Sequence, residues 1–181
     1  VTFVPGFTSP ARRQWEFERS AVAGRAKSEF SGNPVGEKAA IDAWIAANPQ
    51  PKATLAQVAD HIDNIRKVAG IDHIGIGGDF GGVDELPVGL ENVSTYPALF
   101  AELVRRGYSK TDLAKIAQGN ALRVMREVER RAPEMDLTPE RIATSAGLSL
   151  RSLHQLFLLG DCSFHEFLTR ARLARAHALL R

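Results

Sequence analysis

A glycine-rich stretch near the middle of the chain, residues 71–83 (IDHIGIGGDFGGV), limits most narrowly what this sequence can fold into. Ile74 and Ile76 alternate with glycines, which is the period of a β-strand. The predicted strand runs into further glycines and a single carboxylate, Asp79, at its carboxyl end. In a parallel α/β sheet or barrel the βα loops bring catalytic groups to that end. By residue type alone a single aspartate more often caps a turn, so both interpretations stay open.

The totals set the size of the fold and its broad class. The chain has 181 residues, of which 44% are hydrophobic and 24% are charged, as in an ordinary globular protein. This length accommodates one domain and a small second one, and a complete (β/α)₈ barrel needs roughly 200 residues or more. The 23 basic and 21 acidic side chains leave a net charge of +2, which gives no broad attraction to nucleic acid or membrane.

The cysteine content and the hydropathy of the chain bear on its cellular location. The single cysteine, Cys162, excludes an internal disulfide and is compatible with a reducing compartment. No apolar run approaches the roughly 20 residues that cross a bilayer, and the first residues do not have the pattern of a signal peptide. We therefore expect no membrane span and a cytoplasmic location.

Several helices are predicted around the glycine-rich stretch. Residues 1–4 read as a short buried strand that Pro5 ends, and helices are expected over 10–30 and up to about residue 47. Thr54 and Gln57 make a capping box for a further helix. The apolar residues of that helix recur at helical spacing, which predicts one buried face: Leu55, Val58, Ile62, Ile65 and Val68.

Four runs of the sequence resemble the membrane (renal) dipeptidase family: residues 59–70 (ADHIDNIRKVAG), 72–80 (DHIGIGGDF), 89–97 (GLENVSTYP) and 119–124 (GNALRV). The resemblance covers Val1 to about Glu129. It implies a metallopeptidase that hydrolyses dipeptides with a paired zinc site in a (β/α)₈ barrel. The fold expected from it is of the α/β class: the last two β/α units of such a barrel, mostly helical.

The resemblance also implies where the active site lies. Asp79 matches the family's catalytic aspartate beside the metal pair, and the second acid usual two residues later is replaced by Gly81. The family's metal ligands are expected upstream of Val1, so no metal ligand is assigned here and the chain alone is expected to bind no zinc. His61 and His73 are interpreted as structural histidines.

After residue 131 the sequence pattern differs from that of the preceding part of the chain. Residues 137–157 contain two short helical segments around Gly147, with Thr138 and Ser149 as caps and Leu153, Leu156 and Phe157 as a packing face. The runs LTPERIA and AGLSLRSLHQLF, which lie within these residues, resemble the AraC-type transcription activators. That resemblance implies a helix-turn-helix whose second helix presents four side chains to the DNA major groove: Arg151, Ser152, His154 and Gln155.

The predicted domains are therefore a partial dipeptidase barrel (1–131), a junction (132–136) and a partial AraC-type domain (137–181). Arg170, Arg172, Arg175 and Arg181 on the following helix are candidate phosphate contacts, or simply a solvated face.

Three functional interpretations follow. The first is a dipeptidase segment acting on dipeptides, inactive alone because its metal ligands are elsewhere. The second is an AraC-type regulator fragment that binds DNA weakly. The third is a non-functional fusion of two domain fragments, held together by self-association or a partner segment.

Overall fold

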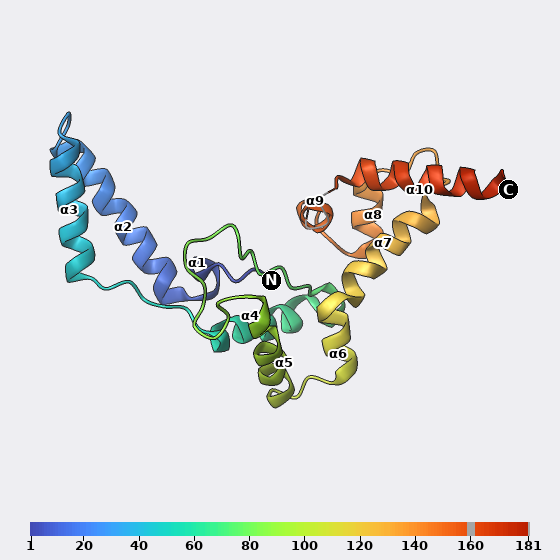
Figure 1. Cartoon of the computed structure of the whole chain (residues 1–181), viewed down its shortest axis with the longest axis horizontal. Coiled ribbons are helices and arrows are strands. Elements are labelled where there is room, and N and C mark those ends of the chain that lie inside the picture. The colour runs from blue at the N-terminus through green and yellow to red at the C-terminus, as the bar shows by residue number, and fades with distance from the viewer. Residues whose placement is uncertain (159–161, 181) are drawn as a thin grey trace. The chain divides into compact units, whose positions relative to one another are not determined.

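The computed structural model describes residues 1–158 and 162–180, and these residues are mostly helical (Figure 1). They form two compact units, which we call the first unit (residues 1–64 and 78–108) and the second unit (residues 65–77 and 109–181). The predicted dominance of helix is confirmed. No helix of the described residues is both long and apolar enough to cross a membrane.

The strands predicted at residues 1–4 and around Ile74 and Ile76 are absent from the residues that the structure describes, which corrects the α/β part of the predicted fold. Ile71–His73 form a 3₁₀ turn (η1), and Ile74 beyond it is buried and extended, with φ −106° and ψ 130°. A strand also needs a neighbouring strand to pair its backbone groups. The pairing that the described residues show is an isolated parallel bridge between Thr54 and Val88.

The first unit begins with a short helix, α1 (Pro5–Thr8), and two longer ones, α2 (Pro10–Glu29) and α3 (Pro34–Ala47). α2 and α3 pack side by side (Figure 1). Between them the rings of Trp15 and Trp44 lie 5.5 Å apart, and the Trp15 indole donates a hydrogen bond of 2.8 Å to the Asn48 carbonyl. The predicted helices at 10–30 and up to residue 47 are thus confirmed.

The capping box that starts α4 (Leu55–Ala69) is confirmed. The Thr54 N–H donates to Gln57 Oε1 at 3.0 Å, and the Gln57 N–H donates to Thr54 Oγ1 at 3.3 Å. Val58 and Ile62 are buried as predicted, whereas Val68 is 78% exposed. The predicted apolar face therefore serves the core over the first part of the helix only.

A short 3₁₀ turn, η2 (Val93–Thr95), leads into α5 (Tyr96–Arg105), whose Leu99 and Leu103 are fully buried. Just after α5, the Arg106 guanidinium connects to α4. It donates hydrogen bonds of 2.7 Å to Asp60, Asp63 and Glu102, and one of 3.1 Å to the Ala56 carbonyl. These bonds join α4 and α5 through polar contacts beside the buried leucines.

In the second unit a helical run continues through α6 (Lys110–Ala114), a π-helical turn η3 (Lys115–Gly119) and α7 (Asn120–Arg131). Three helices follow: α8 (Pro139–Ala146), α9 (Leu150–Leu158) and α10 (Phe164–Leu179). Buried side chains from α7 to α10 form one hydrophobic core: Val124, Val128, Ala132, Leu137, Ile142, Ala143, Ala146, Leu153, Phe157, Cys162, Phe164 and Leu168.

The predicted junction at 132–136 lies against this core. Ala132 is one of its buried members, and the carbonyls of Ala132 and Glu134 accept hydrogen bonds of 2.8 and 2.7 Å from Arg172 on α10. The segment therefore packs against the core and against α10. The three-part domain division itself stays a prediction.

Candidate functional site

Asp79 lies in a strained turn. Among the described residues it is the only non-glycine residue with a positive φ, at 58°. The Gly82 N–H closes the turn with a hydrogen bond of 3.0 Å to the Asp79 carbonyl. This left-handed conformation is costly for most residues, although aspartate tolerates it better than most. Such conformations recur at active sites and ligand-binding loops, and here the exposed carboxylate is presented at the tip of a loop.

The two glycines after Phe80 differ in the space around them. A Cβ atom at Gly82 would lie 2.3 Å from Asp79 Oδ1, so the carboxylate rests against the open side of Gly82. A Cβ atom at Gly81 would meet no atom within 4 Å. Gly82 is therefore required by the present position of the carboxylate, whereas Gly81 leaves room for a side chain.

The residues on either side of Asp79 are held by aromatic side chains. The Phe80 ring packs against Phe3 and Tyr96, with ring centroids 5.8 and 5.6 Å apart, and Phe3 is fully buried. Burial raises the pKa of Tyr96, and the nearby Gly78 backbone partly opposes that effect. The hydroxyl is therefore neutral at physiological pH.

No three side chains of His, Cys, Asp or Glu gather as metal ligands would within residues 1–158 and 162–180. His61 is half-buried, and its burial, with a smaller contribution from the positive amino terminus, lowers its pKa. The His73 ring lies against Gly147, where a Cβ atom would be 2.7 Å from His73 Cε1. Glu85 accepts hydrogen bonds from Arg12 and Gln50.

Asn120 has a role that the sequence did not predict. It lies inside the helical run and is only 8% exposed. Its side-chain amide donates to the carbonyls of Ile71 and Ile74, at 2.8 and 2.7 Å. Asn120 therefore supplies the partners that a neighbouring strand would give to these carbonyls. In the sequence, the one indication of this role was a polar residue, Asn120, placed among the apolar positions of a helix.

Two charged residues also bind this segment. Arg123 Nη2 donates to the Asp72 carbonyl at 2.9 Å, and Lys115 lies 2.7 Å from the Asp72 carboxylate. The hydrogen bond from Lys115, followed by smaller charge effects, lowers the pKa of Asp72. Residues 71–74 are thus fixed by side chains of η3 and α7.

The four predicted DNA contacts share one face of α9. Arg151, Ser152, His154 and Gln155 are all exposed, while Leu153 and Phe157 on the opposite face are fully buried. The Ser152 hydroxyl lies 2.8 Å from that of Ser149, which caps α9. Of the predicted phosphate contacts, Arg172 instead donates to backbone carbonyls, and Arg181 lies outside the described residues.

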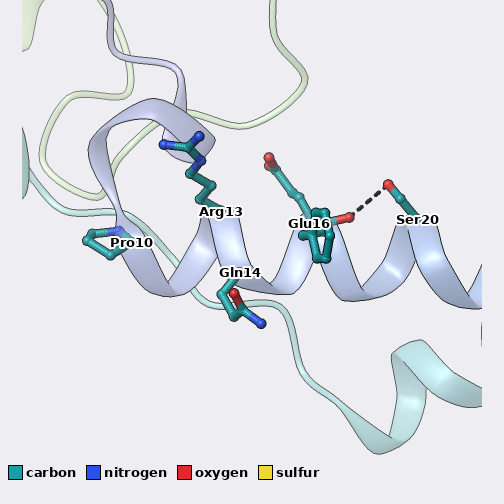
Figure 2. Close-up of a pocket in the computed structure, with 6 residues that line it drawn as sticks. Pro10, Arg13, Gln14, Glu16 and Ser20 are labelled. Carbon is teal, nitrogen blue, oxygen red and sulfur yellow. Dashed lines mark hydrogen bonds between the residues drawn. The ribbon is translucent and has the colours of Figure 1, made fainter.

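A shallow hollow of 520 Å³ lies on α2, and its lining comes from that helix alone: Pro10, Arg13, Gln14, Glu16, Phe17 and Ser20 (Figure 2). In it the Ser20 hydroxyl donates to the Glu16 carbonyl, as the dashed line in Figure 2 marks. None of the predicted site residues lines this hollow. Because a single helix lines the hollow and its polar groups do not converge, the hollow is an open surface and not a binding site.

Comparison with known proteins gives a consistent match. The model of the membrane dipeptidases (peptidase family M19) matches residues 1–138. Dipeptidase 3 of Rattus norvegicus is 52% identical over 77 residues, which are 42% of this chain and 16% of that protein. An uncharacterized dipeptidase of Schizosaccharomyces pombe is 50% identical over 88 residues, 48% of this chain and 21% of that protein.

A solved structure is similar as well. The probable dipeptidase PvdM from Pseudomonas aeruginosa aligns with a TM-score of 0.51 at 29% sequence identity, over 68% of this chain and 35% of its own. The matched segment is thus a minor part of each relative's length. The match to the family model ends at residue 138, and α8 begins directly after it.

Proposed function

Because this chain belongs to the membrane dipeptidase family (peptidase family M19), we propose that it functions in dipeptide hydrolysis and contributes the Asp79 carboxylate to that reaction. The observation that carries the proposal is the left-handed turn at Asp79, within the residues that match the family. Dipeptides are the substrates proposed, by analogy with the relatives that are named dipeptidases.

The role proposed for Asp79 is proton transfer. Hydrolysis of a peptide bond moves a proton from the attacking water to the leaving amine, and a carboxylate within hydrogen-bond reach can carry it. Its exposed position in a held turn suits this role. In this family a pair of zinc ions supplies the Lewis acid. The described residues do not gather ligands for it, so we infer that another polypeptide segment provides them.

Fragment complementation tests the proposal. The chain is co-expressed with an amino-terminal segment of an active family member that carries the metal ligands, and dipeptide hydrolysis is measured. We expect no turnover from the chain alone and turnover from the pair. Asp79→Asn, which keeps the turn, should lower kcat roughly tenfold to 100-fold, because a proton-transfer group is lost.

Three further variants sharpen this result, and two of them are controls. Asp84→Asn, at an exposed acid of the same loop, should leave kcat unchanged. Gly82→Ala should lower kcat because its Cβ displaces the Asp79 carboxylate, whereas Gly81→Ala, with nothing within 4 Å, should not. Hydrolysis by the chain alone would refute the inferred division of the site, and an Asp79→Asn variant as active as wild type would refute the proton-transfer role.

A second candidate function, DNA binding by residues 137–181, is favoured by α9. Four polar side chains face solvent on a helix whose other face packs on the core, and the left-handed Gly147, with φ 67° and ψ 32°, sets the turn before it. A helix held in this way can enter a major groove and present its exposed side chains to base edges. We propose this arrangement as an AraC-type helix-turn-helix.

Arg151→Ala is expected to weaken DNA binding about tenfold at fixed salt, since an arginine contact to a base edge is lost. Fluorescence anisotropy with a pool of labelled random duplexes, followed by selection of the bound sequences, measures this. Binding should also weaken with added salt. The matched control is Arg25→Ala on α2, an equally exposed arginine that should change nothing. Equal losses in both variants would point to non-specific charge attraction and rule out readout by α9.

The third interpretation concerns partners. Several large apolar side chains are exposed among the described residues, including Phe7, Phe17, Val68 and Leu173. We propose that self-association or a partner segment covers some of these side chains. The complementation experiment separates the two, because a segment that restores hydrolysis should also convert self-associated chain into a defined complex.

A further inference from the structure

The ring of His73 lies against the turn between α8 and α9. Gly147, the residue after α8, has the left-handed conformation with φ 67° and ψ 32°. A Cβ atom there would lie 2.7 Å from His73 Cε1 and 3.5 Å from each ring nitrogen, so the ring rests directly on the Gly147 backbone. Position 147 therefore has to provide both a left-handed backbone and a face that is open to a neighbouring ring. Glycine meets both requirements.

The turn at Gly147 sets how the chain leaves α8 and enters α9. The Leu148 N–H donates to the Ala143 carbonyl at 2.8 Å, and the Gly147 N–H donates to the Thr144 carbonyl at 3.2 Å. Helices that end at a left-handed glycine are closed by bonds of this kind. Ser149, which caps α9, follows at once. The direction of α9 therefore depends on the backbone geometry at Gly147.

His73 is brought to this turn by a segment that is itself fixed. The side-chain amide of Asn120 donates to the carbonyls of Ile71 and Ile74, at 2.8 and 2.7 Å. Arg123 donates to the carbonyl of the residue just before His73, at 2.9 Å. Both donors lie on α7, whose buried side chains share one core with α8, α9 and α10. The same helix thus holds the segment that presents His73 and packs with the helices whose turn His73 contacts.

We propose that His73 is a positioning residue for α9: its ring supports the backbone of Gly147 and so fixes the turn that orients α9 toward DNA. The proposal rests on the second candidate function, DNA binding by residues 137–181. His73 lies within the residues that match the membrane dipeptidase family, so a residue of that match serves the DNA-binding part of the chain. His73 itself does not contact DNA and acts through the turn only.

The first test uses the whole chain and requires no DNA. His73→Ala removes the ring, and His73→Phe keeps a ring but removes its nitrogens. We expect amide hydrogen exchange at Leu148, whose N–H closes the turn, to become about fivefold faster in His73→Ala. It should stay near the wild-type rate in His73→Phe. Exchange at Leu168, a buried member of the shared core, should be unchanged in both variants.

His177→Ala is the matched control, because His177 is an exposed histidine on α10 of the same unit. It should leave exchange at Leu148 unchanged. Exchange at Leu148 that keeps its wild-type rate in His73→Ala would overturn the proposal. Equal acceleration at Leu148 and Leu168 would also overturn it, because it would indicate a general loss of stability.

A double-mutant cycle tests the contact between the ring and the turn. Gly147→Asn introduces a residue that tolerates the left-handed conformation but whose Cβ meets the His73 ring. It should lower the urea midpoint of the chain, and by only about half as much in the His73→Ala background, where the ring is absent. Equal shifts of the midpoint in the two backgrounds would contradict the proposed contact.

DNA binding separates this inference from the function on which it rests. In the anisotropy assay His73→Ala should weaken binding about threefold. His73→Phe should bind like the wild type, because an uncharged ring supports the turn as well as imidazole does. Equal losses in the two variants would mean that imidazole contacts DNA itself and would refute positioning. No binding by the wild-type chain would refute the DNA-binding function, while the exchange experiment and the cycle still decide whether His73 holds the turn.

Discussion

Replacing Asn120 with alanine is expected to lower the free energy of unfolding of the second unit by about 3 kcal/mol. The variant leaves the carbonyls of Ile71 and Ile74 without the amide donors that lie 2.8 and 2.7 Å from them. A buried polar group that loses its partner costs about 1–3 kcal/mol, and two are affected here. Urea unfolding followed by circular dichroism measures the total, and amide exchange over residues 71–77 localises it.

Two further substitutions isolate the cause. Asn120→Asp keeps the shape of the side chain but replaces the two N–H donors with a carboxylate facing two carbonyls, so it should destabilise at least as much. Asn64→Ala, at an exposed asparagine of α4, should change the free energy of unfolding by less than about 0.5 kcal/mol. Unfolding of Asn120→Ala at the wild-type urea midpoint would show that the carbonyls find other partners.

Replacing Arg106 with glutamine is expected to lower the free energy of unfolding of the first unit by about 1–2 kcal/mol at pH 7, because three carboxylates lose a shared cation and two of them are partly solvated. The Arg106 side chain is only 17% exposed, and it bonds Asp60, Asp63 and Glu102 at 2.7 Å each. Water replaces such contacts poorly in a partly buried site. Thermal unfolding at neutral pH measures the effect, and a shift no larger than that of an exposed variant would contradict it.

Arg105→Gln is the variant matched to Arg106→Gln. We expect it to change how the stability of the fold depends on pH. Hydrogen bonds from Arg105 first, and from Arg106 second, lower the pKa of Glu102 from 4.5 to about 2. A carboxyl whose pKa is lowered by folding stabilises the fold above pH 4.5 and loses that contribution as pH falls toward 2. Arg105→Gln should therefore flatten the acid loss of stability in that window. It should change little at pH 7, since Arg105 is 72% exposed.

Local signals in the sequence predicted the helices well. Proline at the first position and a polar cap determine where α2, α3 and α8 begin, and the Thr54–Gln57 box does so for α4. These interactions join residues a few positions apart, so their energies hardly depend on the remainder of the fold. Asp79 was likewise identified from the motif around it. Its role and those of the four exposed α9 residues stay predictions.

The family, the helices and the loop that carries Asp79 follow from residues that are neighbours along the chain. How the backbone carbonyls of the extended residues find hydrogen-bond donors depends on the tertiary structure. Alternation at Ile74 and Ile76 predicts an extended backbone but names no partner, and here Asn120 takes the place of a neighbouring strand. The Tyr96 ring likewise reaches Phe80, beside Asp79, from another segment. Such contacts depend on which distant segments meet, and no local pattern encodes that.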